Sequence, residues 1–336
     1  MKENFNQRSP SLLLPGLILS LGILLLTFFL SITLGAANIS LESVFSALTA
    51  FDGSTDQLII RTVRLPRSLI AGFVGASLAV SGALMQGLTR NPLASPTILG
   101  VNAGATFAVV IATFIFGTNS LSIYTWFAFL GAAITAILVY FLGSLGRGGL
   151  TPLNLTIAGA AITTFLASVT SGILIVSQRT LEEIRFWLAG SVAGRDINVF
   201  LQVFPYLAIG LVLAFALGKQ ITVLSLGEDV ASGLGQRTVV IKILAAISIV
   251  LLAGSSVAIA GPIAFIGLVV PHIVRIIISI DYHWLLPYAA IVGAILLILA
   301  DIVSRIIIQP QELPVGLIMP LIGAPFFIYL TRWKVK

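Results

Sequence analysis

The sequence contains no cysteine, only two histidines, and charged residues at just 9% of its 336 positions. Without cysteine the chain cannot form a disulfide, use a thiol nucleophile or bind a metal through sulfur. The histidines, His272 and His283, do not form the H-E-x-x-H pattern of zinc proteases. These absences exclude several classes of enzyme and metalloprotein.

Charge is missing from whole stretches of the chain, and the longest one runs between Arg90 and Arg147. Apolar residues make up 58% of the sequence, more than the interior of a soluble helix bundle of this size could hide from water. A helix of about 20 apolar residues crosses a bilayer, and lipid leaves only helices or closed barrels as spanning structures. The apolar runs are continuous rather than alternating, so the sequence predicts an all-α polytopic membrane protein.

Counting the uncharged runs predicts about ten transmembrane helices in a single domain, residues 1–336. The first run is too long for a signal-peptide core and is predicted to be retained. Gly261 and Pro262 break another run, which places Pro262 in the first turn of the eighth span and Pro271 at a kink. The predicted spans are 11–34, 68–88, 96–116, 122–142, 153–175, 197–217, 241–260, 262–280, 284–303 and 314–331.

An even number of spans places both termini on the same side of the membrane. If that side is the cytoplasm, it holds 11 of the 18 basic residues and every lysine, in agreement with the positive-inside rule. The basic residues are few and scattered, so the net charge of +6 does not indicate a nucleic-acid partner. We therefore predict a multi-pass protein with both termini in the cytoplasm.

A faint repeat joins the two halves of the chain. Gly75, Ser77, Ala79 and Gly82 recur 179 positions later, as Gly254, Ser256, Ala258 and Gly261. Two halves of five spans each would be inverted relative to one another, as in many transporters. Chance matching among small residues explains the pattern equally well.

Small residues also form ridges on single helices. Ala71, Gly75, Ala79 and Gly82 lie on one face of the second span, and Gly100 and Gly104 lie on one face of the third. Such ridges let neighbouring backbones approach closely in lipid. We expect them to mark helix crossings.

The motifs of catalysis and of energy coupling are missing. The sequence has no G-x-S-x-G elbow and no G-x-x-x-x-G-K-[ST] phosphate loop. No ionisable residue is placed near a bilayer centre, where proton-driven transporters carry theirs. The chain is therefore predicted not to be an enzyme, and uphill transport would need energy from another subunit.

Arg61, Arg64 and Arg67 cluster just before the second span, and Asp301 and Arg305 lie one turn apart at the end of the ninth, on the same side of the membrane. Arginine pairs well with carboxylates, so a docking surface for an acidic partner is one interpretation. Interfacial anchoring, or an Asp301–Arg305 pair along one helix, is the other, and spacing alone favours it.

The longest polar segment on the predicted cytoplasmic side runs from Lys219 to Arg237. Its apolar residues recur with helical spacing and are interrupted by Gly227, Gly233 and Gly235. This pattern predicts two short, exposed amphipathic helices, typical of a partner surface or an interfacial helix. A solvated connector is the alternative.

Four blocks of sequence resemble the FecCD family, the permease subunits of ABC importers for iron–siderophores, haem and vitamin B12. The longest is Arg64–Gly104, RLPRSLIAGFVGASLAVSGALMQGLTRNPLASPTILGVNAG. The others are LGEDVASGLG at 226–235, AIAGPIAFIGLVVPHIVR at 258–275, and LADIVSR at 299–305 followed by ELPVG at 312–316 and GAPFF at 323–327. The blocks are specific for the family but not for its cargo.

The resemblance implies a vitamin B12 importer permease-like fold in the bacterial cytoplasmic membrane. Two permease subunits, identical or different, would enclose one pathway above two ABC ATPase subunits, which use ATP and Mg. A binding protein outside the membrane would deliver a ferric siderophore as the commonest cargo, with cobalamin or haem as alternatives. The permease itself would bind no cofactor or metal.

The resemblance also implies roles for particular residues. Arginines at the positions of Arg64, Arg67 and Arg305 meet carboxylates of the binding protein. The coupling helices that fit the ATPase fall at about 220–238, with Leu226, Gly227, Glu228, Ala231, Leu234 and Gly235 as their candidate residues. The cytoplasmic gate would comprise Asn91 and Leu93 together with Thr151 and Pro152, where this chain departs from the small hydroxyl pair of the vitamin B12 permease.

A secondary transporter with an inverted repeat is the competing class. It would explain the repeat but not the absent intramembrane carboxylates or the polar segment at 219–237.

Overall fold

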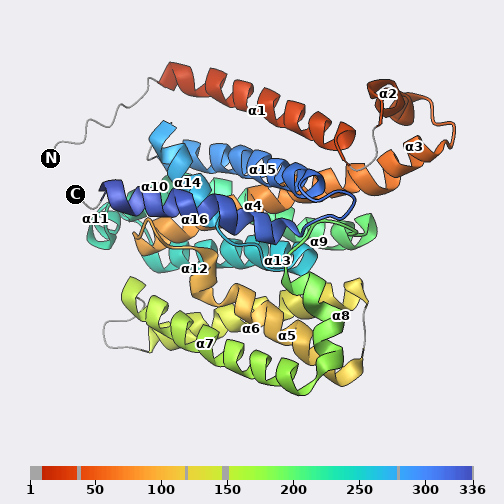
Figure 1. Cartoon of the computed structure of the whole chain (residues 1–336). Helices are drawn as coiled ribbons and strands as arrows, with labels where there is room; N and C mark the ends of the chain where they lie inside the picture. The colour runs from red at the N-terminus through yellow and green to blue at the C-terminus, as the bar shows by residue number, and fades with distance from the viewer. Residues whose placement is uncertain (1–9, 36–38, 118–119, 146–150, 278–280, 335–336) are drawn as a thin grey trace.

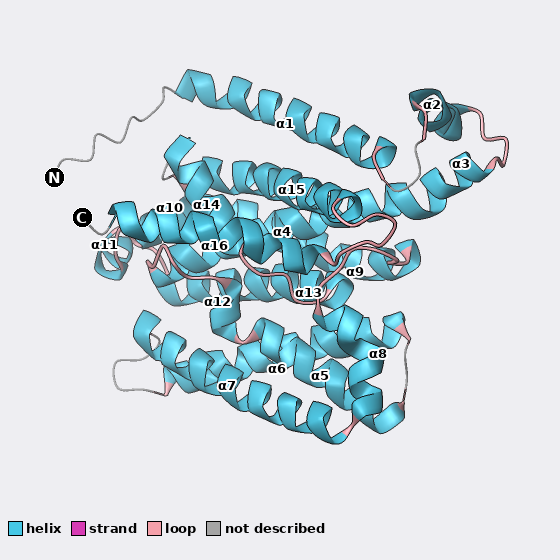
Figure 2. Cartoon of the chain, in the orientation of Figure 1, coloured by secondary structure: helices cyan, strands magenta, loops and turns pink. Residues whose placement is uncertain are grey.

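The structure is a computed structural model that describes residues 10–35, 39–117, 120–145, 151–277 and 281–334. Within these ranges every regular element is a helix (Figure 2). The predicted all-α fold is therefore confirmed. The inverted relation of the two halves and the single-domain boundary stay predictions.

The elements follow one another along the chain as helices and helical turns. In the first half they are α1 (Pro10–Thr33), α2 (Leu41–Thr49), α3 (Thr55–Ile59), a π turn (Ile60–Arg64), α4 (Leu65–Thr89), a 3₁₀ turn (Pro96–Leu99), α5 (Val101–Phe116), α6 (Leu121–Ser144) and α7 (Pro152–Val176). In the second half they are α8 (Gln178–Leu188), α9 (Ile197–Ala216), α10 (Gly218–Ser225), α11 (Glu228–Gly233), α12 (Thr238–Ile249), a π turn (Val250–Gly254), α13 (Ser255–Ala260), α14 (Ile266–Ile277), α15 (Tyr282–Ile306) and α16 (Val315–Lys334).

Among the described residues, seven helices are long and apolar enough to cross a membrane. Three shorter apolar helices, α5, α14 and α16, accompany them. Each of the ten predicted spans falls on one of these helices. The hydropathy pattern thus located the spans, although several ends differ.

Two boundaries differ for physical reasons. The second predicted span begins much earlier, because α3, the π turn and α4 form one continuous helix from Thr55 to Thr89. The prediction that Pro262 lies in the first turn of a helix is wrong. Gly261 and Phe265 both adopt positive φ, and α14 begins only at Ile266.

The break before α14 is held by a neighbouring loop. The amide of Ser191 donates to the carbonyl of Ala260 over 2.7 Å. A Cβ built on Gly190 would lie 2.4 Å from the carbonyl oxygen of Pro262. The chain between α13 and α14 therefore packs against the loop after α8 instead of continuing as a helix.

The predicted ridge on α4 lies at two helix crossings. A Cβ on Gly75 would lie 2.3 Å from the carbonyl oxygen of Gly293 on α15, and one on Gly82 would lie 1.9 Å from that of Gly267 on α14. Gly104 and Gly131 form the same kind of contact between α5 and α6. Close backbone approach replaces side-chain bulk at these crossings, as expected for helices packed in lipid.

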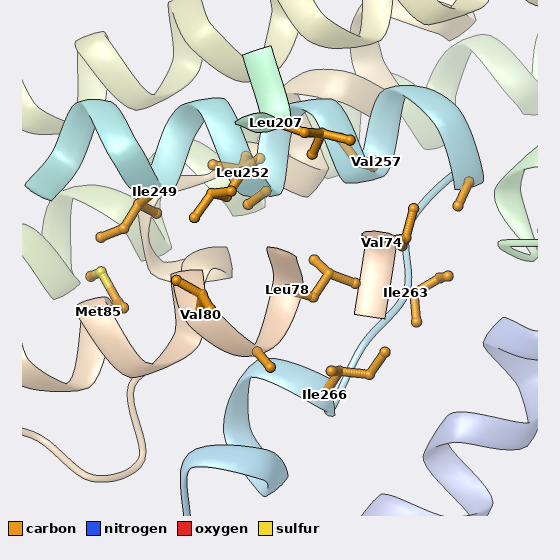
Figure 3. Packing of buried hydrophobic residues seen from close by; sticks show 14 of the residues in the cluster. Val74, Leu78, Val80, Met85, Leu207, Ile249, Leu252, Val257, Ile263 and Ile266 are labelled. Atoms are coloured by element: carbon orange, nitrogen blue, oxygen red, sulfur yellow. The ribbon is translucent and has the colours of Figure 1, made fainter. Parts of the chain in front are cut away.

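Apolar side chains fill the space around α4 (Figure 3). Val74 and Leu78 of α4 lie near Ile263 and Ile266, while Val80 and Met85 lie along the same core. Leu207 of α9 packs near Leu252 and Val257 on the other side. α4 is thereby surrounded on several sides and forms the centre of the bundle.

Figure 1 shows that the bundle has two ends. The start of α1 and the end of α16 lie together with α10 and α11 at one end, called here the α11 end. Helices α2, α3 and α8 lie at the opposite end, the α8 end. The predicted same-side placement of the termini agrees with this arrangement for the described residues, whereas residues 1–9 and 335–336 lie outside them.

Candidate functional site

Two of the three predicted docking arginines, Arg67 and Arg305, meet one buried carboxylate at the α8 end. The guanidinium of Arg67 donates to both carboxylate oxygens of Asp301, over 2.9 to 3.1 Å, and to Glu312 over 2.5 Å. Arg305 also donates to Asp301, its Nε lying 3.0 Å from Oδ2. The predicted pair between Asp301 and Arg305 is therefore confirmed, and Arg67 joins it from 234 residues away.

The same arginines cap the C-terminal end of α1. Arg64 donates to the carbonyl oxygens of Ile32 and Thr33, each over 2.7 Å. Arg305 donates to the carbonyl of Ser31 over 2.8 Å. The last carbonyls of a helix lack partners within the helix and carry its negative dipole end. The arginines thus fasten α1 to α4 and α15.

Burial constrains what these arginines can do. Arg64 is 5% exposed, Arg67 6% and Arg305 2%, so little of any of them reaches the surface. Arg64 and Arg67 also lie within the continuous helix Thr55–Thr89, whereas the sequence analysis had placed them just before a span. Within this chain they bind helices together, and their docking role stays a prediction.

The segment at 219–237 has the predicted form of two short helices. α10 and α11 are separated by Gly227, whose φ of 136° is rarely accessible to other residues. Ala231 is fully buried against the chain, whereas Leu226 and Leu234 are 68% and 70% exposed. The segment therefore presents an apolar surface at the α11 end while staying anchored from beneath.

Glu228 provides that anchor. Both of its carboxylate oxygens accept from the Lys242 ammonium at 2.7 Å, and Thr238 donates to one of them over 3.3 Å. The hydrogen bonds from Lys242 lower the pKa of Glu228 below its ordinary value of 4.5. α11 is in this way tied to the start of α12. Sequence spacing did not single out Lys242.

The predicted gate residues also lie at the α11 end. Asn91 closes a turn by accepting the amide hydrogen of Leu93 over 2.9 Å, and both side chains are exposed. Thr151 caps α7 by accepting from the amide of Asn154 over 3.1 Å, with Pro152 in the first turn. The preceding loop, 146–150, lies outside the described residues.

One narrow crevice brings part of the gate and the coupling segment together. It is lined by Thr151 and Pro152 from the start of α7, by Glu228 and Lys242, and by Arg90 at the end of α4. Asn91 and Leu93 do not line it, although they follow Arg90 directly. The start of α11, the start of α7 and the end of α4 therefore border the same crevice.

Comparison with known proteins identifies the architecture. The FecCD transport family matches residues 23–333. The chain is 51% identical over 314 residues to a probable siderophore transport system permease protein, YfiZ, of Bacillus subtilis, with 94% of each chain covered. It is 46% identical over 318 residues to the iron(3+)-hydroxamate import system permease protein FhuB of the same organism, covering 94% of this chain and 82% of that one.

A solved structure agrees with these relatives. An inward-facing conformation of a metal-chelate type ABC transporter matches with a TM-score of 0.84 and 32% identity, over 96% of this chain and 99% of the other. The fold and the apolar helices therefore define a multi-pass membrane permease of the ABC-importer class. The chain belongs to the FecCD transport family.

Proposed function

We propose that the chain is the permease subunit of an importer for ferric siderophores in the bacterial cytoplasmic membrane. The observation that carries this proposal is the match along 94% of the chain to YfiZ and FhuB, whose names specify siderophore and iron-hydroxamate transport. Vitamin B12 and haem are the alternative cargoes in this family. The two relatives favour siderophores over both.

The energy would come from partner subunits. A second permease subunit, the same chain or a sister, would complete the pathway, and two ABC ATPases would hydrolyse ATP with Mg beneath it. The exposed leucines that follow α10 and α11 support this arrangement, because Leu226 and Leu234 form the apolar contact surface that a groove in another protein requires. The α11 end would then face the cytoplasm.

Coupling would proceed from α11 through its anchor. Closure of the ATPase dimer would push α11, and the Glu228–Lys242 pair would pass that motion to α12. Thr151 and Pro152 border the same crevice, and Asn91 and Leu93 follow its wall at Arg90. These four residues would accordingly form the cytoplasmic gate that opens when α11 moves.

A binding protein would dock at the α8 end. Its carboxylates would meet Arg64, Arg67 and Arg305 only by competing with Asp301 and with the α1 carbonyls. Glu312, whose side chain is 33% exposed, is the accessible edge of this cluster. Docking would therefore be accompanied by rearrangement of the cluster rather than by contact with a preformed surface.

Iron uptake in a deletion strain tests the proposed function. Cells lacking the chromosomal copy are given a panel of radiolabelled ferric siderophores, and in parallel labelled haem and cobalamin, with and without the gene on a plasmid. The proposal expects plasmid-dependent uptake of at least one ferric siderophore. Plasmid-dependent uptake of haem or cobalamin alone would contradict the cargo, and no dependence for any compound would contradict the function.

A further inference from the structure

The α8 end contains a pocket of its own, separate from the crevice at the α11 end. This pocket has no role in the functions discussed above. Its volume is about 330 Å³, within the range of pockets that hold small molecules. Glu183 and Trp187 of α8 line one side, Arg195 of the following loop lines another, and Tyr124 and Glu312 complete it. The pocket thus lies beside the arginine cluster, which contacts it through Glu312.

Each of the two carboxylates of this pocket has an arginine partner. Glu183 pairs through Oε1 with Arg179 over 2.9 Å, while its Oε2 is buried with no hydrogen-bond partner in the described part of the chain. Glu312 pairs with Arg67 over 2.5 Å. Arg195 makes no ion pair with any carboxylate of the described chain. Its one hydrogen bond within the described residues runs from Nε to the carbonyl oxygen of Ser191 over 2.9 Å. The remaining charge of the pocket is therefore positive and is centred on the Arg195 guanidinium.

Arg195 carries this charge in partly dry surroundings. Burial lowers its pKa to about 10, so the guanidinium is still charged at neutral pH. A cation removed from water without a counter-charge is costly, and an anion in the pocket would relieve that cost. The indole Nε1 of Trp187 is likewise buried without an acceptor in the described part of the chain. The pocket thus offers the donors of the Arg195 guanidinium, beside two carboxylates that each have an arginine partner.

We propose that this pocket is a binding subsite for the anionic, oxygen-rich part of an iron chelate as it enters the permease. Carboxylate or catecholate oxygens would accept hydrogen bonds from Arg195, in the bidentate geometry that guanidinium groups favour. The inference rests on the proposed function, which supplies the class of ligand. A single chelating arm, rather than a protein surface, fits a concave space of this size.

Charge-altering variants of Arg195 test the subsite in the complete importer. The permease, its ATPase and its binding protein are reconstituted in vesicles, and uptake is measured with ferric citrate and a ferric tris-catecholate, which are anionic, and with a neutral ferric tris-hydroxamate. Arg195→Gln is expected to lower uptake of the anionic chelate about tenfold, and Arg195→Lys to keep most of it. Docking affinity of the binding protein should not change.

Matched variants separate this subsite from folding and from docking. Arg185→Gln removes an exposed arginine of α8 that does not line the pocket, and uptake should stay at the wild-type level. Trp187→Phe keeps an aromatic side chain but removes the Nε1 donor, and should lower anionic uptake about threefold. This second variant decides the matter if Arg195→Gln does not fold.

Several results would overturn the inference. Unchanged anionic uptake in Arg195→Gln, or in Trp187→Phe where the first variant is unfolded, would do so. So would a loss of docking affinity as large as the loss of uptake, because Arg195 would then contact the binding protein. A wild-type importer that carries only the neutral tris-hydroxamate would also refute the subsite while leaving the proposed function intact. Transport of no iron chelate at all would instead refute the proposed function.

Discussion

Buried charges at the α8 end balance one another residue by residue. Arg67 and Arg305 face Asp301 and Glu312, while Arg64 faces the carbonyls at the end of α1. A buried ion pair adds little net stability, but removing one partner leaves the others uncompensated. Asp301, which is 1% exposed and contacts both arginines, is therefore the most sensitive member.

Replacing Asp301 by asparagine keeps the shape of the side chain and removes its charge. Two buried arginines would then repel each other, so we expect a loss of about 3–5 kcal/mol of stability. Thermal unfolding of the purified chain in detergent measures it. Glu183→Gln, which breaks an exposed pair with Arg179, should cost less than about 1 kcal/mol. Equal stability of Asp301→Asn and wild type would show that Asp301 does not compensate the charges of Arg67 and Arg305.

The Glu228–Lys242 pair gives a prediction about pH. Because the hydrogen bonds from Lys242 lower the folded pKa of Glu228 below 4.5, the pair's contribution is complete above that pH and is lost as the pH falls through the folded value. Affinity for the ATPase, measured on immobilised permease, should thus be flat between about pH 5.5 and about pH 8 and fall only below about pH 4.5, where Glu228 takes up a proton.

Charge exchange is the control for that pair. Glu228→Lys and Lys242→Glu should each uncouple ATP hydrolysis from uptake, and the double variant should restore part of the coupling because the attraction is re-formed. If the double variant were no better than the worse single variant, the anchor would not depend on this pair.

At the scale of whole elements, glycine contacts set how closely the helices cross. Gly75 on α4 and Gly293 on α15 lie backbone to backbone, and neither has space for a side chain. Overpacking of a tight core typically costs about 1–3 kcal/mol, and here the obstacle is rigid backbone. α4 and α15 are also the helices that hold Arg67 and Asp301, so their crossing positions this ion pair.

Gly75→Leu should therefore lower the melting temperature and the yield of folded protein, with a loss of about 3 kcal/mol or more. Gly172→Ala on α7 is the matched control, because nothing lies within 4 Å of a Cβ built there. Fluorescence-detected size-exclusion chromatography across a temperature series measures the melting temperature and the folded yield of each variant. A stable Gly75→Leu protein would mean that the two helices are not closely packed.

The exposed face of α11 gives the second element-scale prediction. Leu234→Asp places a charge in the surface assigned to the ATPase, and copurification of the ATPase should fall at least about tenfold. Phe45→Ser alters a residue of α2 that is 69% exposed at the opposite end, and should leave copurification unchanged. Equal losses in both variants would assign the effect to folding rather than to contact.

For the whole molecule, the sequence predicted the features that arise from local pattern. Uncharged runs located the ten helices, and small-residue spacing located the crossings at Gly75 and Gly104, because both depend on neighbours within one helix. The cluster of Arg67 with Asp301 could not be predicted, because its members are 234 residues apart. The continuation of the second helix back to Thr55 was missed, because charged residues were taken to end it.

In the candidate site, too, features set by local pattern were predicted, and features set by tertiary contact were not. The form of α10 and α11 was predicted from Gly227 and its apolar spacing, but the anchoring role of Lys242 depends on tertiary contact. The pocket around Arg195 combines α8, the loop after it and the segment before α16, and no spacing joins these. Composition indicated a transporter without an energy source, and the comparisons placed it in its family.

Transport by the isolated chain shows whether the permease takes its energy from a partner ATPase. The purified permease is sealed in vesicles alone, and also together with its ATPase, internal ATP and an external binding protein, and radiolabelled ferric siderophore is supplied outside. Accumulation against a gradient is expected only in the complete system, with none for the permease alone. Concentrative uptake by the permease without any ATPase would contradict this expectation.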